Sequence, residues 1–403
     1  MSIFVSILGL AFLILVHEAG HFFTARAVGM SPRKFYIGFP PALIKTRRKG
    51  IEYGIGAIPL GGYVKIPGMH RPAPSDVDMY FAPALAEAPH LLAPAERMKQ
   101  ALVEGEMAAA STHLPELEGS IDATKLSARA ARAAQRGLRE LADALGEDAY
   151  WRQRAWRKVT VIFAGPGANL LLAIVLFFAL FLIVGGTATR TVELVSPDRP
   201  AAQAGLMPGD EIIAVNGQPV EPEDISRHIT SSEGKPVRLT VRRQGQVIKL
   251  RPVAPRQDQG AYRLGFRLDA KSLGPAAALW QSVRLTGIVT KEIGASLTRL
   301  VRGEGREDVA SPVGIVQGSS NALEQGAETY LWVLGLLSLS LALLNLLPLL
   351  PLDGGHIAFS IVEGIRGRSV GREVYERVSA VGIALVLLLF FVGLSNDVGR
   401  LGD

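Results

Sequence analysis

Four long stretches of the chain consist almost entirely of apolar residues, and segments with recurrent polar residues separate them. They run roughly from Ser2 to Phe23, Val161 to Val184, Leu331 to Leu347 and Ala380 to Leu394. Each approaches the ~20 residues that a helix needs to cross a bilayer. The second contains AIVLFFALFLIVGG, which has no polar face and therefore does not fit a core helix of a soluble protein. The pattern predicts four transmembrane helices.

The basic residues predict how these helices are oriented. Lys and Arg gather at both ends of the link between the first and second runs, and they recur in the short link between the third and fourth. The positive-inside rule places both links in the cytoplasm, and it places the N-terminus, the region from Gly185 to Tyr330 and the C-terminus outside. The net charge of +6 therefore reflects membrane orientation, and no nucleic-acid partner is expected. The first run lacks a basic lead-in and a cleavage site, so we expect a retained segment and not a signal peptide.

The two halves of the first cytoplasmic link differ in pattern. Residues Ile51 to Ile66, IEYGIGAIPLGGYVKI, are rich in β-branched and aromatic residues with Gly and Pro between them, which predicts a short hairpin or a looped sheet with bends and not a helix. Its apolar character suggests that it dips into the bilayer. From His70 to Glu147 the composition changes to Ala, Glu, Arg and Pro, and apolar residues between Leu126 and Leu145 follow helical spacing. This predicts a basic amphipathic helix that packs on its own domain or, alternatively, contacts the membrane or a partner.

The region after the second run contains short strands separated by turns. GLMPGDEIIAVNG and VRLTVRRQGQVIKL have the composition of strands, and Asn216-Gly217 is a strong signal for a type I′ hairpin. The first block resembles bacterial, circularly permuted PDZ domains, and Arg263-Leu264-Gly265-Phe266 resembles their carboxylate-binding loop. That resemblance implies peptide binding by these four residues. Beyond it, Ala276 to Val301 has helical spacing and either lies on the outer membrane surface or packs on the module.

The expected fold is a multi-pass α-helical membrane protein with four transmembrane helices, a membrane-associated β-hairpin loop and an inserted extracytoplasmic PDZ-like β-rich domain. The expected segments are 1–69 with the first transmembrane helix and the β-loop, 70–150 with the cytoplasmic helical insert, 151–186 with the second transmembrane helix, 190–270 with the PDZ-like domain, 275–328 with the amphipathic extracytoplasmic segment, and 329–403 with the third and fourth transmembrane helices.

The first apolar run ends in a motif with metal-binding spacing. His17-Glu18-Ala19-Gly20-His21 fits H-E-x-x-H, which places two imidazoles on one helix face where they can share a zinc ion. Glu18 is then placed to act as a general base on water at the metal. An ionisable residue in such a run costs roughly 2.5 to 3.5 kcal/mol on insertion scales, which favours a functional role over a structural His pair. The chain contains no Cys, so any metal must be held by His, Asp or Glu.

A third ligand is expected, because zinc held by two His needs another protein ligand and an open position for water. NLLPLLPLDGGH, from Asn345 to His356, ends the third run with the carboxylate of Asp353. Pro348, Pro351 and two glycines prevent a regular helix there, and an unwound segment with a carboxylate at membrane depth is costly unless it lines a site. Alone, Asp353 could cap a helix, but beside the first motif it is the predicted third ligand. His356 is expected to be structural, since a fourth protein ligand would close the water position.

Together these motifs resemble the site-2 protease family of intramembrane zinc metalloproteases. The resemblance rests on H-E-x-x-H in the first membrane segment, on N-x-x-P-x-x-x-L-D-G late in the chain and on a PDZ-like module between the second and third segments. FAGPGANLLLA, SPVGI and the segment from Ile51 to Ile66 are also similar to stretches of that family, whereas the segment from His70 to Glu147 is not.

The resemblance implies roles for individual residues. His17, His21 and Asp353 would bind Zn²⁺. Glu18 would be the general base and proton shuttle, and Asn345 would hold the substrate backbone or the developing oxyanion. The substrates would be single-pass proteins of the lipid bilayer, such as an anti-sigma factor or remnant signal peptides. The protein would lie in the bacterial cytoplasmic (inner) membrane, with the active site near the cytoplasmic face and the PDZ-like domain outside.

Two other classes of function compete with proteolysis. A catalytically silent membrane scaffold would use the PDZ-like module to bind partners, but it would have no reason to keep Glu18 and its ionisable neighbours in lipid. A metal transporter would need polar residues along several membrane runs, and the second and fourth runs have almost none. Intramembrane proteolysis is therefore the favoured function.

The orientation inferred from the basic residues can be tested with single introduced thiols, because the chain has no Cys of its own. An impermeant thiol reagent applied to intact cells should label Ser232→Cys in the β-rich module. Ser127→Cys in the helical insert should be labelled only after the membrane is permeabilised, since the positive-inside rule places this segment in the cytoplasm. Labelling of both positions from outside would contradict the model with four crossings.

Overall fold

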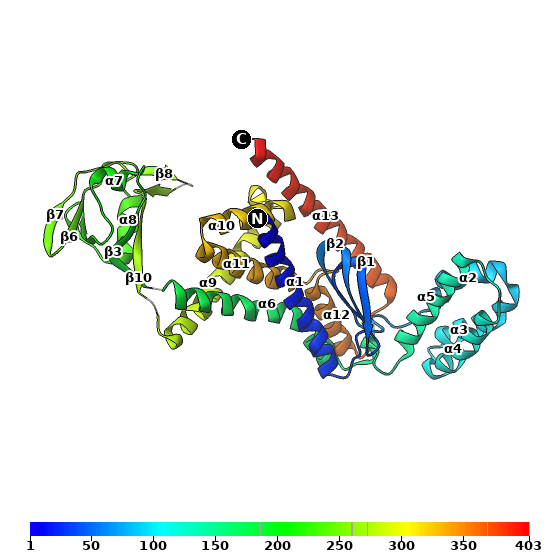
Figure 1. Cartoon of the computed structure of the whole chain (residues 1–403). Coiled ribbons are helices and arrows are strands. Elements are labelled where there is room, and N and C mark those ends of the chain that lie inside the picture. Colours follow the sequence, from blue (N-terminus) through cyan, green and yellow to red (C-terminus); the bar gives the residue numbers. More distant parts are fainter. Residues whose placement is uncertain (186, 259–260, 272, 369, 403) are drawn as a thin grey trace. The chain divides into compact units, whose positions relative to one another are not determined.

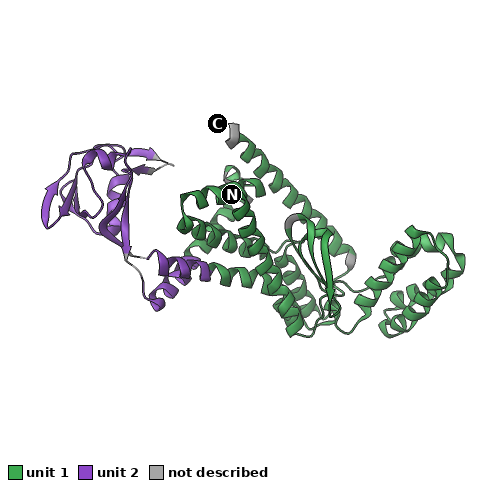
Figure 2. Cartoon of the chain, viewed as in Figure 1, with its two compact units in different colours: residues 1–173, 288–403 green, residues 174–287 purple. Residues whose placement is uncertain are grey.

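A computed structural model describes residues 1–185, 187–258, 261–271, 273–368 and 370–402 (Figure 1). The chain forms two compact units, which Figure 2 shows in different colours. One unit combines Met1–Ala173 with Ile288–Asp403, and the other is Ile174–Gly287. The first unit contains both the H-E-x-x-H and the L-D-G motif, which lie on either side of the second unit in the sequence.

In the described part of the chain, four helices are long and apolar enough to cross a membrane, which confirms the four predicted runs. They are α1 (Ser2–Ala27), α6 (Ala155–Ile183), α11 (Ala327–Asn345) and α13 (Arg372–Gly402), the last with its apolar span at Glu373–Gly399. The helices continue for several residues beyond the apolar runs at their polar ends. Large apolar side chains on their outer faces remain exposed, as expected of surfaces that meet lipid.

The segment predicted as a short hairpin or a looped sheet forms one long strand with a partner that the sequence pattern did not reveal. β2 (Ile51–Lys65) pairs with β1 (Lys34–Arg48) in a two-stranded antiparallel sheet. Gly38 and the adjacent prolines Pro40 and Pro41 interrupt the apolar alternation of β1, and Pro and Gly argue against a strand. Ile51 to Ile66 therefore does not form a hairpin of its own, whereas the alternative prediction of a looped sheet with bends agrees with the structure.

The sheet bends on itself, and its tip is apolar. Lys34–Ile37 lies opposite both Glu52–Ile55 and Gly62–Lys65, whereas Ala42–Arg48 lies opposite Ile51–Gly56. The large exposed side chains near the tip are Phe39, Leu43, Ile44, Ile55 and Ile58. Such a surface suits a membrane interior better than water. That the tip enters the bilayer stays a prediction.

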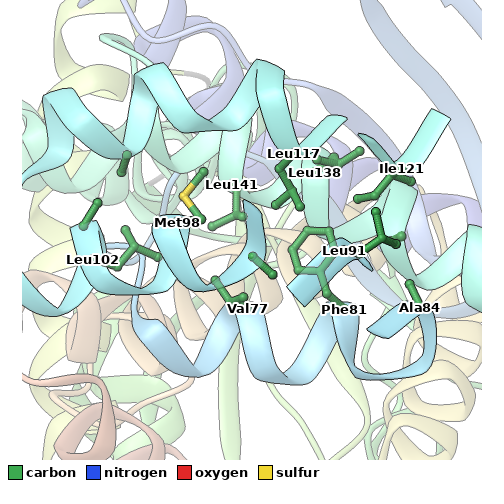
Figure 3. Packing of buried hydrophobic residues seen from close by; sticks show 14 of the residues in the cluster. Val77, Phe81, Ala84, Leu91, Met98, Leu102, Leu117, Ile121, Leu138 and Leu141 are labelled. Carbon is green, nitrogen blue, oxygen red and sulfur yellow. The ribbon is translucent and has the colours of Figure 1, made fainter. Parts of the chain in front are cut away.

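The predicted insert is helical, with four α-helices where the spacing indicated one, and its position in the cytoplasm stays a prediction. Its helices are α2 (Pro74–Glu87), α3 (Leu92–Glu104), α4 (Met107–Asp122) and α5 (Ala128–Leu145), with a short 3₁₀ turn at Pro89–Leu91. Their apolar faces meet in one core around Phe81, Met98, Leu117 and Leu141, each at most 1% exposed (Figure 3). The apolar face of α5 is therefore used within its own domain.

Charged side chains fasten this insert to the β1–β2 sheet. Arg33 places its Nε 2.7 Å from Oδ1 of Asp143 in α5. Lys65 at the end of β2 places its Nζ 2.8 Å from Oε1 of Glu140 and 3.0 Å from Oδ2 of Asp143. Burial acts against the charge of Lys65, but these two carboxylates outweigh it and raise the pKa of the amine. The sheet and α5 are thus joined by a partly buried ion-pair network.

The second unit contains the predicted β-rich module. Its six-stranded sheet has the order β10-β3-β4-β6-β7, with β5 paired to β4. The strands are β3 (Thr187–Val195), β4 (Glu211–Val215), β5 (Gln218–Pro219), β6 (Leu239–Arg243), β7 (Gln246–Lys249) and β10 (Phe266–Lys271); β8 (Arg256–Asp258) pairs separately with β9 (Ala261–Arg263), and the helices are α7 (Pro200–Ala204) and α8 (Pro222–Thr230). Asn216 and Gly217 both have positive φ between β4 and β5, which confirms the predicted turn.

The GLMPGDE block of this module is held by one buried carboxylate. Asp210 is 1% exposed, and both of its oxygens lie 2.7 Å from guanidinium nitrogens of Arg243 on β6. The backbone N–H of Met207 donates to the same carboxylate. Burial acts to raise the pKa of Asp210, but the bidentate ion pair and the backbone donor outweigh it, so the pKa is lowered. The loop before β4 is thereby fixed to the centre of the sheet.

The remaining helices belong to the chain after the module. They are α9 (Pro275–Val301), α10 (Pro312–Gln325) and α12 (Asp353–Arg366), with a short 3₁₀ turn at Arg306–Asp308; another 3₁₀ turn, at Tyr150–Arg152, precedes α6. The predicted helix from Ala276 to Val301 is confirmed as α9, and its position on the membrane surface stays a prediction. Asp397 near the end of α13 accepts hydrogen bonds from the backbone N–H groups of Ser311 and Gly314. The Asp397 carboxylate thus caps the N-terminus of α10, and the two residues that donate to it, Ser311 and Gly314, both belong to the SPVGI stretch.

Candidate metal centre

The two histidines of H-E-x-x-H lie side by side on α1, as their spacing predicts. His17 and His21 are each 7% exposed, and their Nε2 atoms lie 3.2 Å apart. One helical turn separates them, so both rings project from the same face. Both Nε2 atoms therefore present their lone pairs to one point.

Asp353 joins this pair from a distant part of the sequence, as predicted. It begins α12, and its Oδ2 lies 3.1 Å from Nε2 of His17 and 3.4 Å from Nε2 of His21. The two glycines that follow make this possible. A Cβ at Gly354 would lie 2.2 Å from the carbonyl oxygen of Leu346, and one at Gly355 would lie 2.5 Å from the nitrogen of Leu350. Only glycine lets the segment fold back this tightly at the start of α12.

The three ligand atoms have the spacing that zinc requires. Zinc binds imidazole and carboxylate ligands at ~2.0–2.2 Å in a tetrahedron, so neighbouring ligand atoms are expected about 3.3 Å apart. The three observed separations are 3.1, 3.2 and 3.4 Å. Oδ2 of Asp353 is buried and has no hydrogen-bond donor among the described residues. Three acceptors that converge without a donor fit a cation, and three protein ligands leave the fourth position for water.

Helix α6 orients His21, and the sequence analysis did not identify the residues that do so. Nδ1 of His21 lies 2.9 Å from the carbonyl oxygen of Val161, to which it can donate, and this leaves Nε2 as the nitrogen available to a metal ion. A Cβ at Gly165 would lie 2.2 Å from Nε2 of His21, and one at Gly20 would lie 2.2 Å from the carbonyl oxygen of Ala164. The small residues of FAGPG were the available signal, because such residues let membrane helices approach closely.

Glu18 lies beside the metal ligands and against the β2 strand. A Cβ at Gly62 would lie 2.2 Å from Cγ of Glu18 and 2.8 Å from its Oε1. The carboxylate is therefore in direct contact with the strand backbone at Gly62. This contact joins the predicted general base to the sheet, which sequence spacing alone does not indicate.

Asn345 and His356 lie near the centre, but the structure gives neither a ligand position. Asn345 ends α11, and its Nδ2 donates to the carbonyl oxygen of Leu341 at 3.0 Å. Its predicted contact with substrate stays a prediction. In the described chain, the group of possible metal ligands contains His17, His21 and Asp353. His356 is hydrogen-bonded to the hydroxyl of Tyr375, which agrees with the structural role expected for it.

The predicted peptide-binding loop belongs to the other unit and is anchored through its backbone. Leu264 is 2% exposed in the module core, and its carbonyl oxygen accepts from the N–H of Ala201 at 2.8 Å. Gly265 has φ +84°, and its carbonyl oxygen accepts from the N–H of Ser196 at 2.9 Å. Arg263 ends β9 and Phe266 begins β10. Glycine is needed at position 265, because a side chain there would be strained and would meet Arg199.

Gly165→Ala should weaken zinc binding, because the added Cβ would lie 2.2 Å from Nε2 of His21 and the imidazole would have to move. Loss of a supporting contact around a metal ligand typically lowers metal affinity about 10- to 100-fold. Titration with a competing chelator measures this change. Gly167→Ala on the same helix is the control, since its Cβ would lie 3.2 Å from a ring atom of Phe163. Equal zinc affinity in the two variants would contradict the proposed packing.

Comparison with known proteins agrees with this geometry. The model of peptidase family M50 matches residues 5–389. A protein of Agrobacterium fabrum, provisionally named a zinc metalloprotease, is 31% identical over 98% of this chain and 95% of its own. The "Probable protease eep" of Enterococcus faecalis is 28% identical over 96% of each chain. With helices that can cross a membrane and three side chains that could hold a metal ion, the chain belongs to peptidase family M50, the site-2 proteases, a family of zinc-dependent integral membrane proteases.

Proposed function

We propose that this protein hydrolyses peptide bonds within or near the transmembrane segments of single-pass membrane proteins. The main support for the proposal is that His17, His21 and Asp353 converge, with Glu18 beside them. The two histidines and Glu18 lie on α1, a helix that can cross a membrane. The order of the motifs resembles that of the bacterial regulator of sigma-E protease, RseP. By this resemblance, the substrate of the present protein is a membrane protein such as an anti-sigma factor, or a remnant signal peptide.

The residues of the centre divide the chemistry among themselves. His17, His21 and Asp353 would hold Zn²⁺, which activates water and polarises the scissile carbonyl when it is bound. Glu18 accepts the proton of the attacking water and delivers it to the leaving amine. Asn345 supplies an amide that can turn from its present acceptor, the carbonyl of Leu341, to the substrate backbone or to the developing oxyanion.

The substrate must also be unwound, because the amides of a transmembrane helix are already bonded within the helix. The β2 strand offers an edge on which an unwound segment can be held. Gly62–Lys65 pairs with Lys34–Ile37 on one side, and no other described strand pairs with it on the opposite side. Gly62 contacts Glu18, so a peptide added to this edge passes close to the general base.

The location of the site supports cleavage near the cytoplasmic face. His17 and His21 lie in the second half of α1 (Ser2–Ala27), and the basic link that follows is cytoplasmic by the positive-inside rule. The β-rich module then lies outside the cell, and the protein lies in the bacterial cytoplasmic membrane. We propose that the module is a PDZ-like domain that controls access, either by capturing a newly exposed C-terminus at Arg263 to Phe266 or by obstructing bulky outer domains.

Metal binding and proteolysis should separate by residue. Glu18→Gln should retain one zinc ion per chain, since Glu18 is not a ligand, and should lower the rate of cleavage by about 10²- to 10⁴-fold because the general base is lost. His21→Ala should lose both zinc and activity. Elemental analysis of the purified protein measures the metal, and a single-pass reporter substrate measures cleavage. Full activity of Glu18→Gln with normal zinc content would contradict the proposed mechanism.

Deletion of residues Thr191 to Leu268 tests whether the module controls access. Ala188 pairs with Ala270, so the ends of the deletion lie close together and a short linker can join them. Cleavage of a substrate with a short outer tail should persist, and cleavage of one with a large outer domain should increase, because the obstruction is removed. If both substrates resist cleavage while the protein still folds and binds zinc, the module is needed to assemble the active site.

A further inference from the structure

A cavity with a strongly basic lining lies between the β1–β2 sheet and helix α5 of the insert. Its volume is about 710 Å³, within the range of ~300–1,000 Å³ that small-molecule sites occupy. Seven of the lining side chains are Lys or Arg and three are Asp or Glu, so the cavity has a positive excess. None of these residues belongs to the metal centre. The proteolytic chemistry therefore does not account for this concentration of charge.

The acidic side chains pair with some of the basic side chains of the lining and leave others unpaired. Asp143 and Glu140 are engaged by Arg33 and Lys65. Glu52 lies 3.5 Å from Nζ of Lys34. Arg47, Arg136 and Arg139 also line the cavity, and none of the three has a carboxylate partner among the described residues. Arg136 lies over the ring of Tyr80 at 5.8 Å. Three unpaired guanidiniums at one cavity are an anion-binding arrangement.

The same sheet shows where this cavity lies relative to a membrane surface. Along β1, Leu43 and Ile44 are apolar and 70% and 69% exposed, whereas Lys45 is the first of several exposed basic residues. Across the sheet, Ile44 pairs with Ile55 and Arg47 pairs with Glu52. Along β1 the apolar tip of the sheet thus changes to its charged end between Ile44 and Lys45. Such a sharp change is typical of a segment that crosses from hydrocarbon to headgroups.

We propose that this cavity binds the phosphate of an anionic phospholipid headgroup. The apolar tip would place the cavity at headgroup depth, and Arg47, Arg136 and Arg139 would meet the phosphate. Basic pockets beside membrane segments bind anionic headgroups in this way. Zwitterionic lipids carry a cation next to the phosphate, which the surrounding Lys and Arg side chains repel, so the site would prefer phosphatidylglycerol to phosphatidylcholine. A bound lipid would bridge the sheet and α5.

Binding of short-chain lipids to the purified full-length protein tests the proposal. Dihexanoyl phosphatidylglycerol, dihexanoyl phosphatidylcholine and inorganic phosphate are titrated separately, and native mass spectrometry or calorimetry measures binding. The wild-type protein should bind the phosphatidylglycerol at least tenfold more tightly than either other ligand. Equal affinity for the two lipids would overturn the headgroup assignment, and equal affinity for inorganic phosphate would identify free phosphate as the ligand instead.

Substitution of the three unpaired arginines locates the site. Each near-surface Lys or Arg contributes about fivefold to the binding of anionic lipid, so the triple variant R47Q/R136Q/R139Q should bind about 100-fold more weakly. The control R48Q/R129Q/R132Q removes three exposed charges from the same two elements outside the cavity, and it should change affinity less than about threefold.

Three further outcomes of this comparison would overturn the proposal. Equal losses in both triple variants would show that only the overall surface charge matters. Cavity-dependent binding of an acidic peptide in the absence of lipid binding would assign the cavity to a protein segment. If R47Q/R136Q/R139Q loses its helical circular dichroism, R139Q alone replaces it, and unchanged lipid affinity in that single variant would overturn the site.

Discussion

Three ionisable side chains within an apolar environment have to satisfy one another and a metal ion, and the rest of this structure depends on that constraint. His17, His21 and Asp353 are largely buried, and an unpaired charge in such surroundings costs far more than a hydrogen bond returns. Their ligand atoms lie within 3.4 Å of one another. Because metal geometry tolerates errors of only about 0.2 Å, the helices that carry these residues must be held closely in register.

Small residues allow the helices that carry these side chains to pack closely. Helices in a membrane gain no hydrophobic free energy by associating, so dispersion contacts between closely packed backbones have to hold them together. Gly20 and Gly165 bring α1 against α6, and Gly354 and Gly355 bring the start of α12 against the preceding turn. A single methyl group at any of these positions would collide with a backbone or with a ligand ring. The glycines are thus part of the metal centre although none of them binds the metal.

The β1–β2 sheet connects this centre to a part of the chain that has no zinc chemistry. Gly62 touches Glu18, and Lys65, three residues further along the same strand, joins the helical insert through Glu140 and Asp143. The insert is thus linked through one strand to the residue beside the candidate metal ligands. The β-rich module belongs to a separate unit and has its own core.

The sequence by itself determined the four apolar helices, the candidate metal-binding residues and the β-rich module, because hydrophobic runs, the H-E-x-x-H spacing and turn residues such as Asn216-Gly217 are local signals. It did not reveal β1, whose prolines and Gly38 disguise a strand that is stabilised by pairing with residues up to about thirty positions away. Nor did it reveal the contacts of Gly165 with His21 or of Lys65 with the insert. Only the tertiary structure decided these, since each joins side chains or backbones whose proximity no local pattern encodes.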